Sequence, residues 1–263
     1  MRMISKVVRY VLLDVLRNRW VLAYALFFFA TTDILLRLGG SGPRALLSLL
    51  NVVLLLIPLV TIVFGTIYWH GAREFNELLL SQPVERSTLF HGLFAGLVIP
   101  LSLAFVVGIS IPLALHQAID GETIPFLAMM LVAGVALTAV FGAMAVLIGG
   151  LVDDRLKGLG MALGVWLLLT VAYDAIVLWI AMAYQDASLE KVMLALTFAN
   201  PVDLARVLLI LRFDQAALMG YTGAVVQRML GGSMGVVLAA TGLAVWTLVP
   251  GLFALRAFRR RDF

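Results

Sequence analysis

The sequence predicts an all-α, polytopic membrane protein with six transmembrane helices. Of its 263 residues, 63% are hydrophobic and only 13% are charged, whereas a soluble domain usually has about 25% charged residues. The mean hydropathy is +1.06, and six windows are apolar for the roughly 20 residues that a helix needs to cross a bilayer. This composition excludes a disordered chain, a nucleic-acid-binding domain and a large soluble catalytic domain.

The predicted elements form one membrane domain over residues 1–263. Residues 1–19 repeat apolar side chains at helical spacing, with charged residues around the other face. This pattern predicts an amphipathic helix on the membrane surface. The spans are expected at about 20–38, 46–69, 92–115, 124–151, 159–184 and 234–256. Small residues at Gly134, Thr138 and Gly142, and at Gly160 and Gly164, predict close contact between helices.

The distribution of basic residues predicts the orientation. If both termini lie on one side, that side carries thirteen of the 19 Lys and Arg residues and the other side carries six. The positive-inside rule therefore places both termini in the cytoplasm of a bacterium, in its inner membrane. It also makes the loop at 70–91 cytoplasmic and the segment 185–233 extracytoplasmic.

Segment 185–233 is too apolar for a free loop and too interrupted for further spans. Within it, Asn200 is suited to cap a helix, Pro201 to occupy its first turn, and Asp203 to lie near the positive end of its dipole. A helix of about 11 residues and 17 Å is too short to cross. We therefore expect short outer-face helices that enter the membrane partway or lie at its surface.

No catalytic or metal site is predicted in the chain. It contains no Cys, its three His residues are isolated in sequence, and its Met residues show no repeated ligand spacing. It also lacks the G-x-x-x-x-G-K-[ST] loop that holds nucleotide phosphates. We expect no enzyme activity and no cofactor in this chain.

Tyr173 and Asp174 form the clearest polar site inside a predicted span. A carboxylate at the centre of a bilayer costs about 2.5–3.5 kcal/mol on insertion scales, so Asp174 must face a partner or water. Two interpretations stay open: a pathway or gating residue, and a structural hydrogen bond between helices.

The segment 68–89 combines charge with an apolar patch, and Pro83 interrupts it. The order of an amphipathic N-terminal helix, six spans, this Arg73-to-Val84 stretch after the second span, and a structured loop before the sixth resembles ABC-2-type transporter permeases. The resemblance implies a coupling segment that docks on an ATPase subunit. The residues assigned to it are Arg73, Glu74, Phe75, Asn76, Glu77, Leu78, Leu79 and Leu80.

Two stretches are most similar to permeases that serve maturation of the copper centres of nitrous oxide reductase: 83–86, and 200–206 with 218–225 after it. This implies a homodimer in the lipid bilayer, two cytoplasmic ATPases that bind ATP and Mg, and a periplasmic β-helical protein. Asn200, Pro201, Asp203 and Arg206 are expected to contact that periplasmic partner. The alternatives are an ABC-2 exporter of a drug or lipid, and an ATP-independent channel or secondary transporter.

Overall fold

The computed structural model describes residues 18–39, 41–72, 86–121, 123–183, 190–210 and 233–260. Within these ranges every regular element is a helix, and the first described element is α2. The long helices are α2 (Arg19–Gly39), α3 (Gly42–Gly71), α5 (Arg86–Leu115), α6 (Thr123–Leu151) and α12 (Ser233–Arg260). The remaining span, Arg155–Ala183, is composed of α7 (Arg155–Leu167), a π-helix η1 (Leu168–Ala172) and α8 (Tyr173–Ala183).

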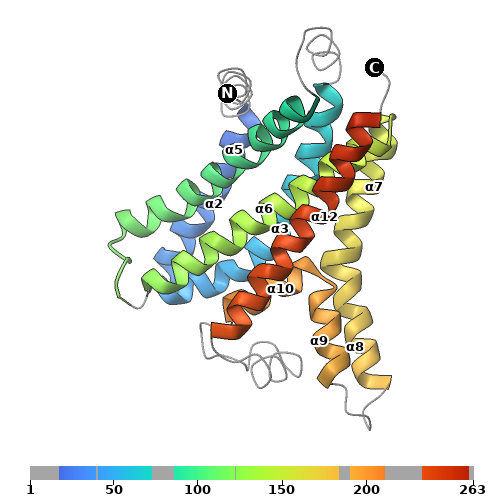
Figure 1. Ribbon diagram of the computed structural model, residues 1–263. Coiled ribbons are helices and arrows are strands. Elements are labelled where there is room, and N and C mark those ends of the chain that lie inside the picture. The colour runs from blue at the N-terminus through green and yellow to red at the C-terminus, as the bar shows by residue number, and fades with distance from the viewer. Residues whose placement is uncertain are drawn as a thin grey trace.

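The described residues contain six helices long and apolar enough to cross a membrane. This confirms the all-α class and the six predicted spans. Figure 1 shows that α2 begins and α12 ends at one end of the bundle, which we call the terminal end. The end of α3 and the start of α5 also lie there, next to the part of the chain that the structure does not describe.

Several helices begin earlier than the sequence predicted. α3 begins at Gly42 and not near 46, because Pro43 lies in its first turn, where a helix needs no donor from it. α5 begins at Arg86 and not near 92, so it includes the end of the predicted 70–91 loop. Arg19, assigned to the surface helix, is the first residue of α2, whose start Asn18 caps by accepting the Trp20 N–H at 3.0 Å. Residues 1–17 lie outside the described part of the chain.

α6 is the most buried of the six long helices, and it contacts α3, α5 and α12. As predicted, small residues permit the approach. A Cβ at Gly134 would overlap the Phe105 ring, and one at Gly142 would lie 3.0 Å from Val98 Cγ2. A Cβ added at Gly160 or Gly164 would have no described atom within 4 Å, so the close contact predicted there is not formed among the described residues.

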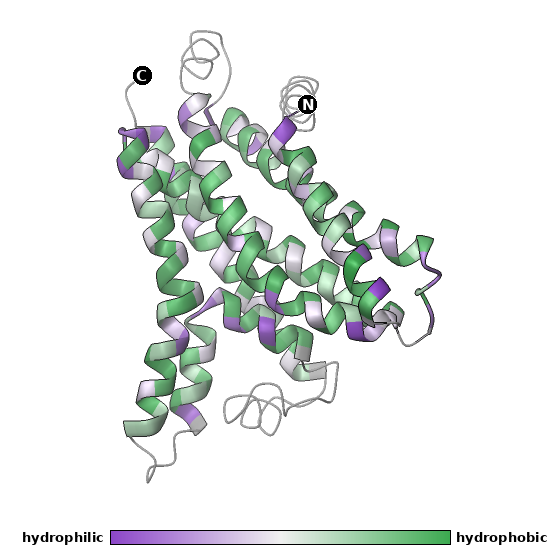
Figure 2. Cartoon of the chain, turned by 180° about the vertical axis from the view of Figure 1, so that it is seen from behind, coloured by the Kyte–Doolittle hydropathy of each residue, from purple (hydrophilic) through white to green (hydrophobic). Residues whose placement is uncertain are grey.

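The bundle has an apolar exterior. Large side chains such as Trp20, Leu38 and Trp179 are exposed, and Figure 2 shows hydrophobic colour along the length of the helices with polar residues gathered mainly toward their ends. At the end opposite the termini, Asp33 of α2 pairs with Arg37 and with His116, each at 2.7 Å. Lipid is the natural solvent for such a surface.

Two short helices interrupt the chain before α12. α9 (Glu190–Phe198) and α10 (Pro201–Ile210) meet at an angle of 107°. In Figure 1, α9 lies beside α8, and α10 turns away from it toward α12. The predicted short helices therefore exist, and Asn200 caps α10 by accepting the Val202 N–H at 2.9 Å. Residues 184–189 and 211–232 lie outside the described residues.

Candidate functional site

The predicted coupling segment lies outside the described residues. This applies to each of its assigned side chains: Arg73, Glu74, Phe75, Asn76, Glu77, Leu78, Leu79 and Leu80. Its two flanks are described, because α3 ends at Gly71 and α5 begins at Arg86. The site can therefore be built from the residues that hold these flanks.

An aromatic cluster joins the flanks to α12. The ring centroid of Trp69, near the end of α3, lies 6.4 Å from that of Phe90 in α5 and 5.6 Å from that of Phe258 in α12. Phe90 and Phe258 are 6.0 Å apart. All three side chains are buried, and Gly149 of α6 has no Cβ where the Trp69 indole packs. Edge-to-face aromatic pairs add about 0.5–1.5 kcal/mol beyond their burial, so this cluster fixes both flanks relative to α12.

His70 connects the same end of α3 to the start of α7. Its Nδ1 lies 2.8 Å from the Thr66 carbonyl oxygen, and its Nε2 lies 2.9 Å from the Val152 carbonyl oxygen in the short link between α6 and α7. In that link Asp154 caps α7 by accepting the Lys157 N–H at 2.9 Å. This backbone hydrogen bond is the main cause that holds the pKa of the Asp154 carboxyl below its usual value.

A second polar cluster lies where the Arg155–Ala183 span meets α10. The guanidinium of Arg206 pairs with Asp174 of α8 and with Asp203 of its own helix, each at 3.0 Å. The Tyr173 hydroxyl donates to the Leu196 carbonyl oxygen of α9 at 2.6 Å. A charge inside the membrane is tolerated when it is paired, and Arg206 gives Asp174 that partner.

The bend between α9 and α10 is held to the same span. The Asn200 Nδ2 donates to the Leu169 carbonyl oxygen in η1 at 2.8 Å, and the Trp246 indole of α12 donates to the Phe198 carbonyl oxygen at 3.1 Å. A π-helix changes the register of backbone hydrogen bonds, and here the carbonyl of Leu169 receives a side-chain donor. The bend therefore has fixed contacts with both η1 and α12.

The structure unites residues that the sequence placed in two separate sites. Tyr173 and Asp174 were predicted as an intramembrane site, and Asn200, Pro201, Asp203 and Arg206 as a partner contact. Sequence spacing could not show that Arg206 reaches Asp174, which is 32 residues away. Sequence reasoning also missed His70, whose bond to Val152 spans 82 positions; no local pattern signals such a contact.

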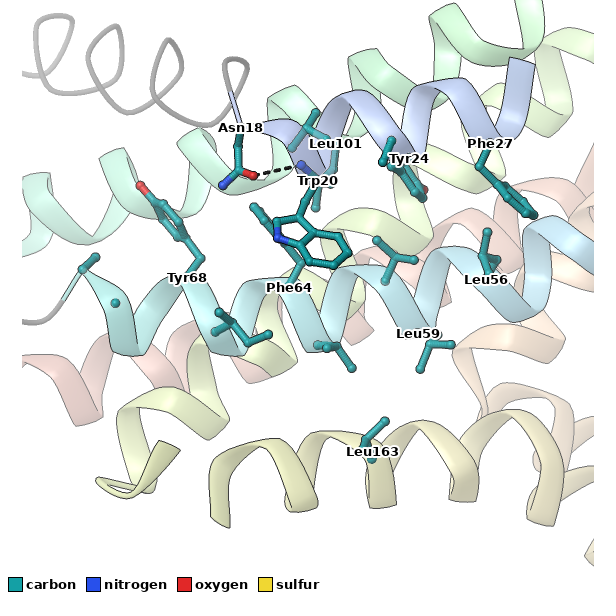
Figure 3. Close-up of a pocket in the computed structure, with 17 residues that line it drawn as sticks. Asn18, Trp20, Tyr24, Phe27, Leu56, Leu59, Phe64, Tyr68, Leu101 and Leu163 are labelled. Atoms are coloured by element: carbon teal, nitrogen blue, oxygen red, sulfur yellow. Dashed lines mark hydrogen bonds between the residues drawn. The ribbon is translucent and has the colours of Figure 1, made fainter. Parts of the chain in front are cut away.

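An apolar groove of about 960 Å³ lies between α2, α3 and α7. Tyr24 and Phe27 line it from α2, Leu56 and Phe64 from α3, and Leu163 from α7 (Figure 3). Asn18, Trp20 and Tyr68 lie together toward one end of the groove, at the start of α2. The groove could hold an apolar chain, with these polar groups at one end. Among the described residues, no three His, Asp or Glu side chains are grouped to hold a metal ion.

Comparison with known proteins identifies the family. The sequence model of the family described as "ABC-2 family transporter protein" matches residues 12–263. The chain belongs to the ABC-2 transporter family. It is 27% identical to the probable ABC transporter permease protein NosY of Stutzerimonas stutzeri and 28% identical to that of Pseudomonas aeruginosa, and each alignment covers 99% of both chains.

Family membership and the six spans define the coarse role of the chain. It is a transmembrane permease subunit of an ABC transporter in the inner membrane. As a permease of this family, the chain works with ATPase subunits.

Proposed function

We propose that the chain is the permease of an ABC transporter that serves maturation of the copper centres of nitrous oxide reductase. The observation that supports this most is the full-length similarity to two NosY permeases, each alignment covering 99% of both chains. ATP and Mg would be bound by the partner ATPase. The permease would convert closure of that ATPase into movement of its own helices, either to pass a substrate or to transmit force.

The terminal end of the bundle is the cytoplasmic side in this proposal. Segment 73–80 would dock on the ATPase there, between the flanks that Trp69, Phe90 and Phe258 hold. Apolar anchors at Phe75, Leu78 and Leu79 would contribute most of the docking free energy, with Arg73, Glu74 and Glu77 as rim charges. A buried anchor is commonly worth about 2 kcal/mol or more, whereas an exposed ion pair is worth roughly 0–1 kcal/mol.

The opposite end would receive a periplasmic β-helical protein. α9 and α10 would form its platform, since their bend is held to η1 and α12. Because Arg206 and Asp203 are ion-paired within the chain, their contribution would be to hold α10 in position for the partner. Replacing both with Ala should reduce co-purification of the partner while membrane insertion is retained; unchanged co-purification would reject this platform.

We further propose that two copies of the permease assemble with two ATPases, because six spans are half of the roughly twelve expected of such a transporter. Differently tagged copies should co-purify from detergent, and the complex should contain one permease per ATPase. A complex with one permease and two ATPases would refute the homodimer.

The central experiment compares Phe75→Ala combined with Leu79→Ala against Glu74→Ala, in a nitrous-oxide-respiring host that lacks its own permease. The double variant should lose ATPase binding to membranes and maturation of the copper enzyme, while Glu74→Ala should retain most of both. The reverse result would make the interface electrostatic. The unmodified chain could also be fully expressed and bind the ATPase without restoring copper-enzyme maturation. That result would reject the role in maturation and indicate a permease for another substrate.

Export of an apolar substrate is a second candidate, and the 960 Å³ groove beside α3 favours it. Leu163→Trp would fill part of the groove from α7. If the cargo is a lipid or drug, this variant should reduce its ATP-dependent transport in vesicles. Under the first proposal the same variant should leave copper-enzyme maturation nearly unchanged.

A further inference from the structure

His70 lies where the end of α3 meets the link between α6 and α7. It is the penultimate residue of α3, and the described chain continues only to Ala72 before segment 73–85. Its ring contacts the α6–α7 link through the Val152 carbonyl oxygen and lies against the first turn of α7, where a Cβ on Gly158 would be 2.9 Å from His70 Cε1. A residue beside segment 73–80 is thus in direct contact with the start of the Arg155–Ala183 span.

The His70 ring lies between two carbonyl oxygens, with Nδ1 at 2.8 Å from Thr66 and Nε2 at 2.9 Å from Val152. A carbonyl oxygen only accepts hydrogen bonds, so the ring nitrogen that carries the proton donates. With the proton on Nε2, His70 donates to the Val152 carbonyl oxygen and joins α3 to the α6–α7 link.

The side chains near His70 join α3 to different helices. Trp69 contacts α5 and α12 through Phe90 and Phe258, so it does not by itself connect α3 to α7. A further side-chain hydrogen bond joins the Trp166 indole of α7 to the Leu55 carbonyl oxygen, about four turns nearer the start of α3. The contact of His70 with Val152 lies at the other end of α3, beside segment 73–80.

We propose that His70 is a positioning residue that transmits displacement of segment 73–80 to α7 through its hydrogen bond to Val152. This rests on the proposed function, in which that segment docks on an ATPase. The Arg155–Ala183 span, which begins with α7, carries η1 and α8, and these hold Asn200 and Arg206 of the bent pair. Displacement at the ATPase therefore reaches the outer helices along one continuous span.

His70→Gln and His70→Asn separate the bridge from the local bond. The Gln amide can reach the Val152 carbonyl oxygen, whereas the shorter Asn amide can donate only to Thr66 within α3. Normal ATPase binding and hydrolysis require a folded permease, so these two measurements separate a loss of coupling from a loss of folding. His91 of α5 is the matched control. Like His70, it has Nδ1 close to the carbonyl oxygen four residues earlier, that of Ser87, at 2.6 Å.

The test uses the complete permease–ATPase complex in vesicles. ATPase binding, ATP hydrolysis and copper-enzyme maturation are measured for His70→Gln, His70→Asn and His91→Asn. Because the chain has no Cys, Leu178→Cys on exposed α8 also gives one spin-label site per copy, and the ATP-dependent change in distance between copies reports movement of the span.

His70→Asn should bind the ATPase and hydrolyse ATP normally, but it should lose the distance change. Its yield of mature copper enzyme per ATP hydrolysed should fall about tenfold, the equivalent of about one hydrogen bond. His70→Gln should retain much of both, and His91→Asn should match the unmodified chain. Equal coupling in the Asn and Gln variants would overturn the role of the bridge while the proposed function stands. Failure of the unmodified chain to bind the ATPase would instead reject the proposed function.

Discussion

Asn200 makes hydrogen bonds on both sides of the bend between α9 and α10. Its Oδ1 accepts from Val202 at the start of α10, and its Nδ2 donates to Leu169 in η1. The residue is fully buried, so no water is available to replace either bond. A single side chain thereby joins the cap of one helix to the π-helix of a membrane span.

We expect Asn200→Ala to destabilise the protein by about 2–4 kcal/mol. Loss of a cap costs about 1 kcal/mol, and leaving a buried polar group unsatisfied costs about 1–3 kcal/mol. Asn18→Ala is the matched control, because Asn18 caps α2 through one exposed bond. Thermal unfolding in detergent should show a clearly larger loss for Asn200→Ala, and equal losses would mean that the bond to Leu169 contributes nothing.

The ion pairs of Arg206 should be unequal in their effect on stability. Removing Asp174 leaves Arg206 paired with Asp203, whereas Arg206→Met leaves Asp203, whose side chain is only 12% exposed, without its partner. Breaking a buried pair from one side costs about 3–5 kcal/mol, against roughly 0–1 kcal/mol for an exposed pair. Arg206→Met should therefore unfold more readily than Asp174→Asn in the same assay. If Asp203→Asn added to Arg206→Met restores no stability, the cause is not the unpaired carboxylate.

At the scale of elements, the fit between helices depends on a few positions without a side chain. Gly149 and Gly150 are adjacent in α6, yet a Cβ at Gly149 would overlap the Trp69 indole, whereas a Cβ at Gly150 would meet its nearest neighbour, Ala257 Cβ, at 4.0 Å. The first position is therefore closed to any larger residue, and the second is open.

This difference predicts opposite results for two adjacent substitutions. Gly149→Ala should cost about 1–3 kcal/mol, as overpacking does, and should displace Trp69 from Phe90 and Phe258. Gly150→Ala should be neutral or stabilising, because Ala favours the helix. Thermal unfolding and Trp fluorescence of the two purified variants measure this. A similar loss for both would show that the helix itself, and not the Trp69 contact, requires glycine there.

The sequence predicted the helices but not most of the contacts between them. Hydropathy predicted the six spans because lipid requires each helix to be apolar along its length, and local capping chemistry predicted the start of α10 at Asn200. The contacts of His70 with Val152 and of Arg206 with Asp174 were not predictable, since they depend on how helices pack. Likewise, Gly160 and Gly164 have the spacing of a packing motif but meet no neighbour among the described residues, because spacing does not specify which face of α7 is packed.

At the scale of the whole molecule, one span connects the two candidate sites. The first turn of α7 lies against His70 at the terminal end, and α8 pairs with Arg206 of α10. α8 has no buried residue among its described side chains, and its Val177 and Ile180 pack against the buried Met193 of α9, so these two helices are suited to move together. The arrangement suits a permease that must relate events at one membrane surface to helices near the other.

The proposed coupling requires the terminal end of the bundle to face the cytoplasm. Gly121 follows α5 at the end opposite the termini, and Asp153 lies between α6 and α7 at the terminal end. Because the chain has no Cys, Gly121→Cys and Asp153→Cys can each be labelled without background, and both sites are exposed. The excess of Lys and Arg at the terminal end favours its retention in the cytoplasm. A membrane-impermeant maleimide should therefore label Gly121→Cys on intact spheroplasts and label Asp153→Cys only after permeabilisation. The opposite pattern would place segment 73–80 outside the cell, where no ATPase could reach it.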